Sequence, residues 1–256
     1  MAACFWKDSG MIAYASDPDK DVHRDQAMRL FKVGKEVATE GRKNVRDWAK
    51  NRFVFPILYG SYHVSCARHI WEAVEGGGKL PDGTTARKWL TGKGIGSPAA
   101  YEQHVKGVED AFMRQFPTFA ERKERWWNQY VRRGWFRLPT GFVVQGVYGR
   151  NFLMNCPIQG SGFHCLLWSL IRIMKVLRKR RMRSLIIGEI HDCIIFDAPE
   201  DELQDLLALA KEVMTEDLRK AWPWVCVPMG VEVDVSDTTW HGKQPWVEHG
   251  GKWGPK

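Results

Sequence analysis

A polar pair, His191-Asp192, interrupts two apolar runs and is the part of the sequence best suited to chemistry. The runs, in LIIGEIHDCIIF at positions 185–196, are rich in β-branched residues and predict two buried strands joined by a tight hairpin. Because an unpaired carboxylate is costly to bury, we expect the hairpin tip to present Asp192 to a metal ion or to solvent. The alternative is a plain turn in which the Asp bonds its own backbone.

A second group of candidate residues is basic and has helical spacing. Arg42, Arg46 and Lys50 recur every four residues, which places them along one slowly drifting helix face. Like charges stacked in this way destabilise an isolated helix, so we expect a polyanion such as a triphosphate at that face. A solvated basic face is the alternative. Phe55 and Tyr59-Gly60 continue the pattern with aromatic rings.

The composition describes a folded, basic protein. The 256 residues include 13 Trp and 12 Phe, and 44% are hydrophobic, which argues against disorder and allows a substantial core. The formal charge of +8 favours a polyanionic partner, most simply nucleic acid, although anionic lipid also fits. The six cysteines form no CxxC pair, and no run approaches the roughly 18 apolar residues that span a bilayer. We therefore expect a soluble, cytoplasmic protein.

The order of the expected elements predicts an α+β fold, with helices first and mixed strands and helices afterwards. Helices are expected at 21–31, from Thr39 to Tyr59 with a bend near Pro56, up to Gly76, and at 99–116, 117–133, 157–181 and 199–221. Strands are expected at 135–138, 142–148, in the 185–196 hairpin and at 231–235. Residues 76–98, rich in Gly, Pro, Thr and Lys, predict an exposed loop around a short helix.

The basic helix resembles the fingers helix of the DNA polymerase I-like (family A) DNA polymerases. That helix carries Arg, Lys, Phe and Tyr-Gly at four-residue intervals, matched here by Arg46, Lys50, Phe55 and Tyr59-Gly60. Lys50 and Phe55 are five residues apart, which in a regular helix turns Phe55 about 180° away from Arg46. A one-residue π-bulge, or distortion before the following proline, would restore the shared face. His23 resembles the fingers His that contacts the incoming triphosphate.

The segment NCPIQG is similar to the family's NxPIQG segment. The resemblance implies that Asn155 and Gln159, four residues apart on a helix that begins at Pro157, touch the template–primer. The family usually has an Arg four residues before this Asn. Here that position is Asn151, with Arg150 beside it as a candidate DNA contact. A capped core helix without a DNA contact is the alternative.

The hairpin is similar to the family's final motif, His-Asp-Glu between apolar strands. The resemblance implies that Asp192 binds catalytic magnesium and that His191 approaches the primer end, with Lys50 as a further catalytic candidate. Cys193 stands where Glu is usual, which removes one carboxylate. The family's phosphoryl transfer uses two Mg²⁺ ions clamped by two aspartates. The segment of DYSxxExR type that carries the other aspartate is not found, and Asp8 is too close to Asp17 to belong to it.

We therefore expect the C-terminal part of a split or truncated polymerase, with a palm remnant at 1–20, fingers at 21–134 and palm at 135–256. Its expected partners are primer–template DNA, deoxynucleoside triphosphates and a separately encoded N-terminal chain that supplies the first catalytic aspartate. The alternatives are an inactive remnant that binds primer–template or nucleotide, and a basic scaffold protein with unused motifs. The FVFP pattern suggests a bacteriophage protein, located in the host cytoplasm.

Overall fold

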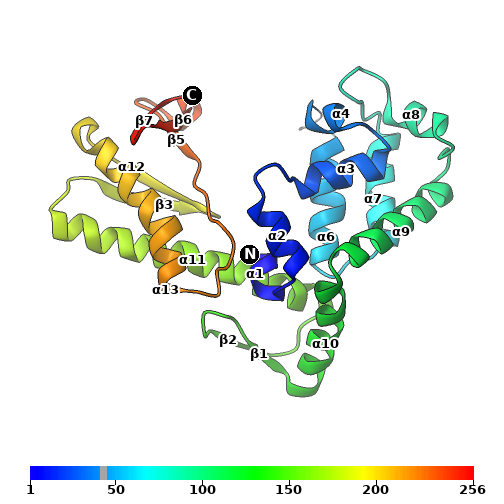
Figure 1. Cartoon of the computed structure of the whole chain (residues 1–256), viewed down its shortest axis with the longest axis horizontal. Helices are drawn as coiled ribbons and strands as arrows, with labels where there is room; N and C mark the ends of the chain where they lie inside the picture. The colour runs from blue at the N-terminus through cyan, green and yellow to red at the C-terminus, as the bar shows by residue number, and fades with distance from the viewer. Residues whose placement is uncertain (41–44) are drawn as a thin grey trace. The chain divides into compact units, whose positions relative to one another are not determined.

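The computed structural model describes residues 1–40 and 45–256 (Figure 1). The chain forms two compact units, Ala2–Ile158 and Gln159–Lys256, and Met1 belongs to the second. The boundary falls inside one long helix, α11 (Arg150–Arg180). The class is mostly helical α+β, as the order of the elements predicts.

The first unit is mainly helical. Its helices are α1 (Ala2–Trp6), α2 (Ser9–Ser16), α3 (Val22–Phe31), α4 (Lys35–Glu40), α5 (Asp47–Ala49), the π-helical turn η2 (Lys50–Val54), α6 (Phe55–Leu58), α7 (His63–Glu75), α8 (Ala86–Gly92), α9 (Pro98–Gln115) and α10 (Pro117–Arg133). The expected helix at 117–133 is confirmed, and Gly134, at φ 72°, ends it. The short helix expected within 76–98 is confirmed as α8. A small antiparallel pair follows, β1 (Trp135–Arg137) and β2 (Val143–Gln145).

Asp8 ties the first residues to the rest of this unit. It is fully buried, and its two carboxylate oxygens accept the backbone N–H groups of Met11, at 2.9 Å, and Phe119, at 3.0 Å. One side chain therefore caps the starts of α2 and α10. Residues 2–6 and 9–16 are helical and form no strand, so Asp8 has a structural role here.

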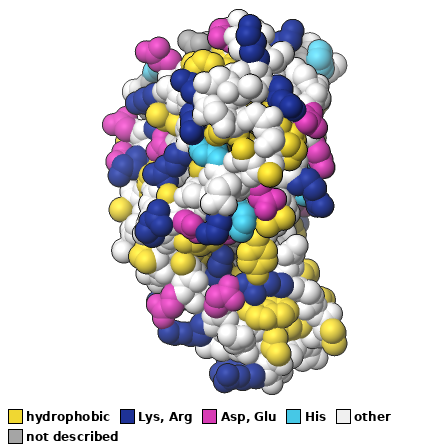
Figure 2. Space-filling view, turned by 90° about the vertical axis from the view of Figure 1, so that its right-hand side faces the viewer, with side chains coloured by type: hydrophobic (Ala, Val, Ile, Leu, Met, Phe, Trp, Pro, Cys, Tyr) yellow, Lys and Arg dark blue, Asp and Glu magenta, His cyan; other side chains and the backbone are white. Residues whose placement is uncertain are grey.

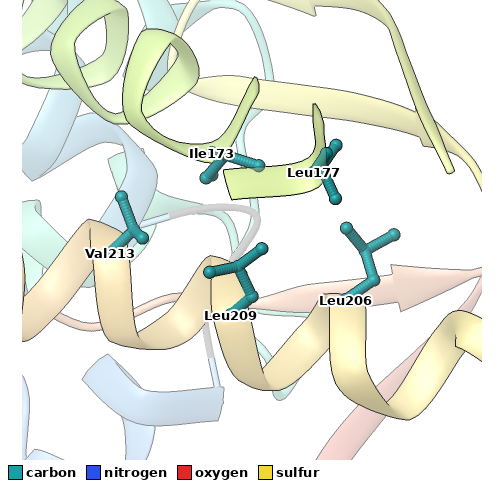
Figure 3. Close-up of a cluster of buried hydrophobic side chains, with 5 residues drawn as sticks. All are labelled: Ile173, Leu177, Leu206, Leu209 and Val213. Carbon is teal, nitrogen blue, oxygen red and sulfur yellow. The ribbon is translucent and has the colours of Figure 1, made fainter. Parts of the chain in front are cut away.

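The second unit packs α11 against a helical segment near the C-terminus. That segment comprises η3 (Glu200–Glu202), α12 (Leu203–Glu212), the π-helical turn η4 (Val213–Asp217) and α13 (Leu218–Ala221). Figure 3 shows the core between them, where Ile173 and Leu177 of α11 face Leu206, Leu209 and Val213. Burial of such side chains contributes about 1.5–3 kcal/mol each.

Two small sheets complete the second unit. The first is the hairpin of β3 (Leu185–Ile190) and β4 (Cys193–Asp197). The second has the order β5 (Val233–Val235), β6 (Gln244–His249) and β7 (Lys252–Pro255). The short helix η5 (Trp240–Gly242) lies between β5 and β6 in the sequence. The strand expected at 231–235 is thus confirmed as the shorter β5. No helix among the described residues is long and apolar enough to cross a membrane.

Two expected helix starts are wrong. Thr39 lies inside α4, where its hydroxyl donates to the Lys35 carbonyl at 2.7 Å, so it is an interior helical residue and not the expected N-cap. Pro157 lies inside α11 rather than at its first turn. A proline removes the helical bond to the carbonyl four residues earlier. Here that carbonyl, of Leu153, accepts the Trp126 indole N–H at 2.9 Å, which compensates for the lost bond.

We predict that Trp126→Phe destabilises the protein by about 1–3 kcal/mol, because the buried Leu153 carbonyl then has neither a helical nor an indole donor. Urea unfolding followed by circular dichroism measures the change. Trp127→Phe is the matched control, since no hydrogen bond to that half-buried indole is found within the part of the chain that the structure describes. Equal stability of the two variants would show that the indole bond does not compensate for Pro157.

Candidate functional site

The helical segment 45–58 presents two faces. Its inner face buries Val45, Ala49, Phe53 and Ile57, which recur every four residues. Its outer face carries the half-buried side chains predicted to act on a ligand, Arg46, Lys50, Phe55 and Tyr59. Arg42, expected on the same basic face, lies outside the described residues.

A π-helical turn brings Phe55 onto the outer face. The Phe55 N–H donates to the Lys50 carbonyl, five residues back, and residues 50–54 form η2. The Lys50 Nζ then lies 5.5 Å from the centre of the Phe55 ring, and the Phe55 and Tyr59 rings stack at 5.9 Å. The expected π-bulge is thereby confirmed, and its extra residue compensates for the five-residue spacing.

His23 joins this group from α3. Its ring contacts the Phe55 ring edge-to-face at a centroid distance of 5.5 Å. Asp21, just before α3, accepts the Arg46 Nε–H at 2.7 Å. We call His23, Arg46, Lys50, Phe55 and Tyr59 the basic–aromatic cluster.

His23 is the neutral member of the basic–aromatic cluster. The pKa of His23 is lowered to about 4, mainly by burial and also by the charges of Arg46 and Lys50, while Asp21 and Asp47 oppose the shift. Its Nδ1 atom is buried and has no hydrogen-bond partner among the described residues. At neutral pH the cluster therefore offers two cationic donors, one neutral imidazole and two rings, a set that suits a phosphorylated, aromatic ligand.

Gly60 lets this segment pack closely against the start of α11. Its φ of +92° favours glycine, and a Cβ there would lie 3.0 Å from the Met154 Cγ and 3.4 Å from the Asn151 Oδ1. Gly60 thus has a packing role beside the basic–aromatic cluster.

Arg150 is engaged within its own unit. It forms an ion pair with Glu124, and its guanidinium lies over the rings of Tyr62, at 5.6 Å, and Trp127, at 5.8 Å. Its Nε and the Asn155 Oδ1 are buried, and neither has a hydrogen-bond partner within residues 1–40 and 45–256. These two orphaned polar atoms are suited to bind a ligand. The expected DNA contacts of Arg150 and Asn155 stay predictions.

The second unit holds the His191-Asp192 hairpin. Ile190 pairs with Cys193, so the turn has two residues, and His191 adopts φ 58°. The expected hairpin is confirmed, and Asp192 is exposed at its tip. Gln159, at the start of this unit, is also exposed.

The expected burial of both hairpin strands is wrong. One face packs on the core through Ile186, Ile194 and Phe196, whereas Leu185, Ile187 and Ile190 are 59%, 61% and 50% exposed. Within the described residues β3 pairs only with β4, so no further strand or helix covers those three side chains. An apolar strand of this kind is a ready template for another strand.

Asp192 suits magnesium as a ligand but does not make a complete site. Its carboxylate is the hard oxygen donor that Mg²⁺ prefers, whereas the neighbouring Cys193 thiol is a soft, poor ligand for it. In the part of the chain that the structure describes, no three His, Cys, Asp or Glu side chains gather closely enough to hold a metal.

One face of the molecule carries side chains of both charges. On the face in Figure 2, Lys and Arg side chains are interspersed with Asp and Glu.

Comparison with known proteins places these residues in context. Residues 1–242 match the family model described as DNA polymerase family A. DNA polymerase I of Lactococcus lactis subsp. cremoris is 28% identical over 223 residues, covering 86% of this chain and 22% of that protein. For DNA polymerase I of Bacillus subtilis the identity is 25% over 235 residues, covering 92% and 24%. The chain thus spans less than a quarter of these relatives.

Two further similarities are informative. The DNA polymerase of Bacillus phage SP01 is 43% identical over 61 residues, covering 24% of this chain and 7% of that protein. Among solved structures, the POL domain of Pol1 from M. smegmatis, in complex with DNA primer-template and dNTP, matches with a TM-score of 0.61 at 20% identity. That match covers 89% of this chain and 35% of the other, and it supports the fold.

We predict that stability falls as the pH drops from about 6.5 to about 4, partly through His23. Folding lowers the pKa of His23, so below the usual histidine pKa the unfolded chain takes up a proton that the folded chain refuses. Once both forms are protonated, below about pH 4, the contribution of His23 stays constant.

Urea unfolding at pH 7 and pH 5 measures this effect. The stability difference between the two pH values should shrink in His23→Asn and stay unchanged in His69→Asn, which alters an exposed histidine. An identical pH dependence in His23→Asn and the unmodified chain would contradict the assigned burial of a neutral imidazole.

Proposed function

Because this chain belongs to DNA polymerase family A, we propose that it takes part in template-directed DNA synthesis from deoxynucleoside triphosphates. The observation that carries the proposal is the basic–aromatic cluster, in which η2 aligns Phe55 with Lys50 and Tyr59. In the proposed role Arg46, Lys50 and His23 bind the triphosphate. Phe55 and Tyr59 face the sugar and base, which matches the apolar side of a nucleotide, and Gly60 lies next to Tyr59 at this site.

The remaining residues are assigned by the same proposal. Residues 21–134 form the fingers, 135–256 the palm and 1–20 a remnant of the palm. Arg150, Asn155, Gln159 and His191 contact primer–template DNA. The orphaned polar atoms of Arg150 and Asn155 support this assignment, as does the DNA in the solved M. smegmatis relative.

Magnesium is the proposed cofactor, with Asp192 as its ligand in this chain. When bound, Mg²⁺ supplies a positive charge that stabilises the phosphates during transfer. We propose that a second aspartate comes from a strand outside residues 1–256, on a separately encoded chain. The exposed Leu185, Ile187 and Ile190 beside the hairpin support this strand-pairing partner.

A second candidate function is a noncatalytic one, in which the chain binds primer–template or nucleotide but does not polymerise. Cys193 at the position of the usual Glu favours it, because the hairpin then offers one carboxylate where two cations must be held. The similarity to the phage SP01 polymerase supports a bacteriophage source for either function.

We predict that Lys50→Ala, tested in an assembled active enzyme, lowers kcat/KM for a deoxynucleotide. The loss of transition-state stabilisation should be about 2–4 kcal/mol, because a charge-assisted phosphate contact is lost. Steady-state primer extension measures the loss. Lys88→Ala is the control, since it removes an exposed lysine from another helix. Unchanged kinetics in Lys50→Ala would remove Lys50 from the nucleotide site.

We predict that the chain alone does not extend a primer, whereas the chain mixed with a polypeptide that carries a DYSxxExR-type strand does. The added strand would place a second carboxylate beside Asp192 and complete the metal site. The assay is primer extension with magnesium and four deoxynucleotides.

In the reconstituted enzyme, Asp192→Ala should abolish extension and leave DNA binding largely intact. Asp201→Ala, an exposed control outside the hairpin, should keep both primer extension and DNA binding. Efficient extension by the purified chain alone would defeat the split-enzyme proposal. DNA binding without extension, even after partners are added, would favour the noncatalytic function.

A further inference from the structure

Asp21 connects the two helical segments that carry the basic–aromatic cluster. One carboxylate oxygen, Oδ1, accepts the backbone N–H groups of His23 at 2.9 Å and Arg24 at 3.1 Å. The other, Oδ2, accepts the Arg46 Nε–H at 2.7 Å. One partly buried side chain thus holds both the first turn of α3 and a cation 25 residues away.

The contact leaves the phosphate-binding end of Arg46 available. Asp21 engages Arg46 through Nε, and no other hydrogen bond to the Arg46 side chain is found among the described residues. The two terminal amino groups of the guanidinium form the fork that binds phosphate oxygens in pairs. Because Asp21 already holds the Arg46 side chain, ligand binding causes a smaller loss of conformational entropy in that side chain.

Asp21 also occupies the start of α3. Free N–H groups at a helix N-terminus attract phosphate. Here Asp21 takes up those of His23 and Arg24, which leaves Arg46 and Lys50 as the available donors to an anion at the cluster. The same cap fixes the backbone of His23, whose ring contacts Phe55.

The carboxylate of Asp21 is ionised at neutral pH. Burial raises the pKa of Asp21, but the hydrogen bonds from Arg46, Arg24 and His23 outweigh it and hold that pKa below its usual value. The ion pair with Arg46 is therefore a charged one, with side chains 20% and 28% exposed for Arg46 and Asp21.

We propose that Asp21 is a positioning residue for nucleotide binding, which holds Arg46 and His23 so that both face one triphosphate. The inference rests on the proposed nucleotide-binding function. It makes a prediction opposite to simple electrostatics, since removing a negative charge near the site would otherwise strengthen binding of an anion.

Asp21→Asn separates the two contacts. Asparagine caps helices as well as aspartate does, so the variant keeps the α3 cap but loses the ionic hold on Arg46. We expect the melting temperature to change little and the Kd for dATP to rise about tenfold, the order expected when the ligand must order a long side chain itself. Asp19→Asn, two residues away and exposed, is the matched control for the loss of charge.

Titration calorimetry of the full chain with dATP and magnesium measures the Kd of the unmodified chain, both Asn variants, Arg46→Ala and the Asp21→Asn/Arg46→Ala double variant. If Asp21 acts through Arg46, the double variant binds as Arg46→Ala alone does. Binding by Asp21→Asn that is as tight as, or tighter than, that of the unmodified chain overturns the proposal. Fully additive losses in the double variant overturn it as well.

Lys50→Ala in the same titration keeps the two hypotheses apart. Weaker binding in Lys50→Ala, together with unchanged binding in Asp21→Asn, rejects the positioning role and keeps the nucleotide site. If the unmodified chain does not bind dATP, the proposed nucleotide site fails, and the role of Asp21 fails with it.

Discussion

One backbone hydrogen bond, from the Phe55 N–H to the Lys50 carbonyl, determines how the outer face of residues 45–58 is arranged. A regular helix would turn Phe55 to the side opposite Arg46, because nine residues separate them. The wider π-helical turn instead brings Phe55 beside Lys50 and stacks it on Tyr59, while the inner face keeps its four-residue spacing. π-Helical turns are rare and occur frequently at functional sites.

The charges of the two units call for ligands of opposite sign. In the first unit Arg46 and Lys50 are compensated in part by Asp21, while the low pKa of His23 keeps that side chain neutral. In the second unit Asp192 extends from the hairpin as a single exposed carboxylate. The first arrangement suits an anion such as a phosphate group, and the second suits a hard cation such as Mg²⁺.

Local signals predicted much of the fold. The helix after Asp21, the end of α10 at Gly134 and the two-residue hairpin follow from helical patterning, a helix-ending glycine and strand periodicity. Apart from Thr39, which lies inside α4, the errors concern long-range contacts. The indole of Trp126 permits Pro157 inside α11, and exposure of β3 depends on which elements cover it.

The candidate site divides in the same way. The spacing of the basic and aromatic residues was visible in the sequence, and so was the need for either a π-bulge or a distortion before Pro56. The ion pair between Asp21 and Arg46 was not, because 25 residues separate them. The most direct test of the central claim is photocrosslinking of the full chain with an azido-substituted dATP and magnesium, mapped by mass spectrometry. If the outer face of residues 45–58 binds the nucleotide, labelling occurs within 45–60 and excess dATP prevents it. Labelling elsewhere, or labelling that excess dATP does not prevent, would contradict this.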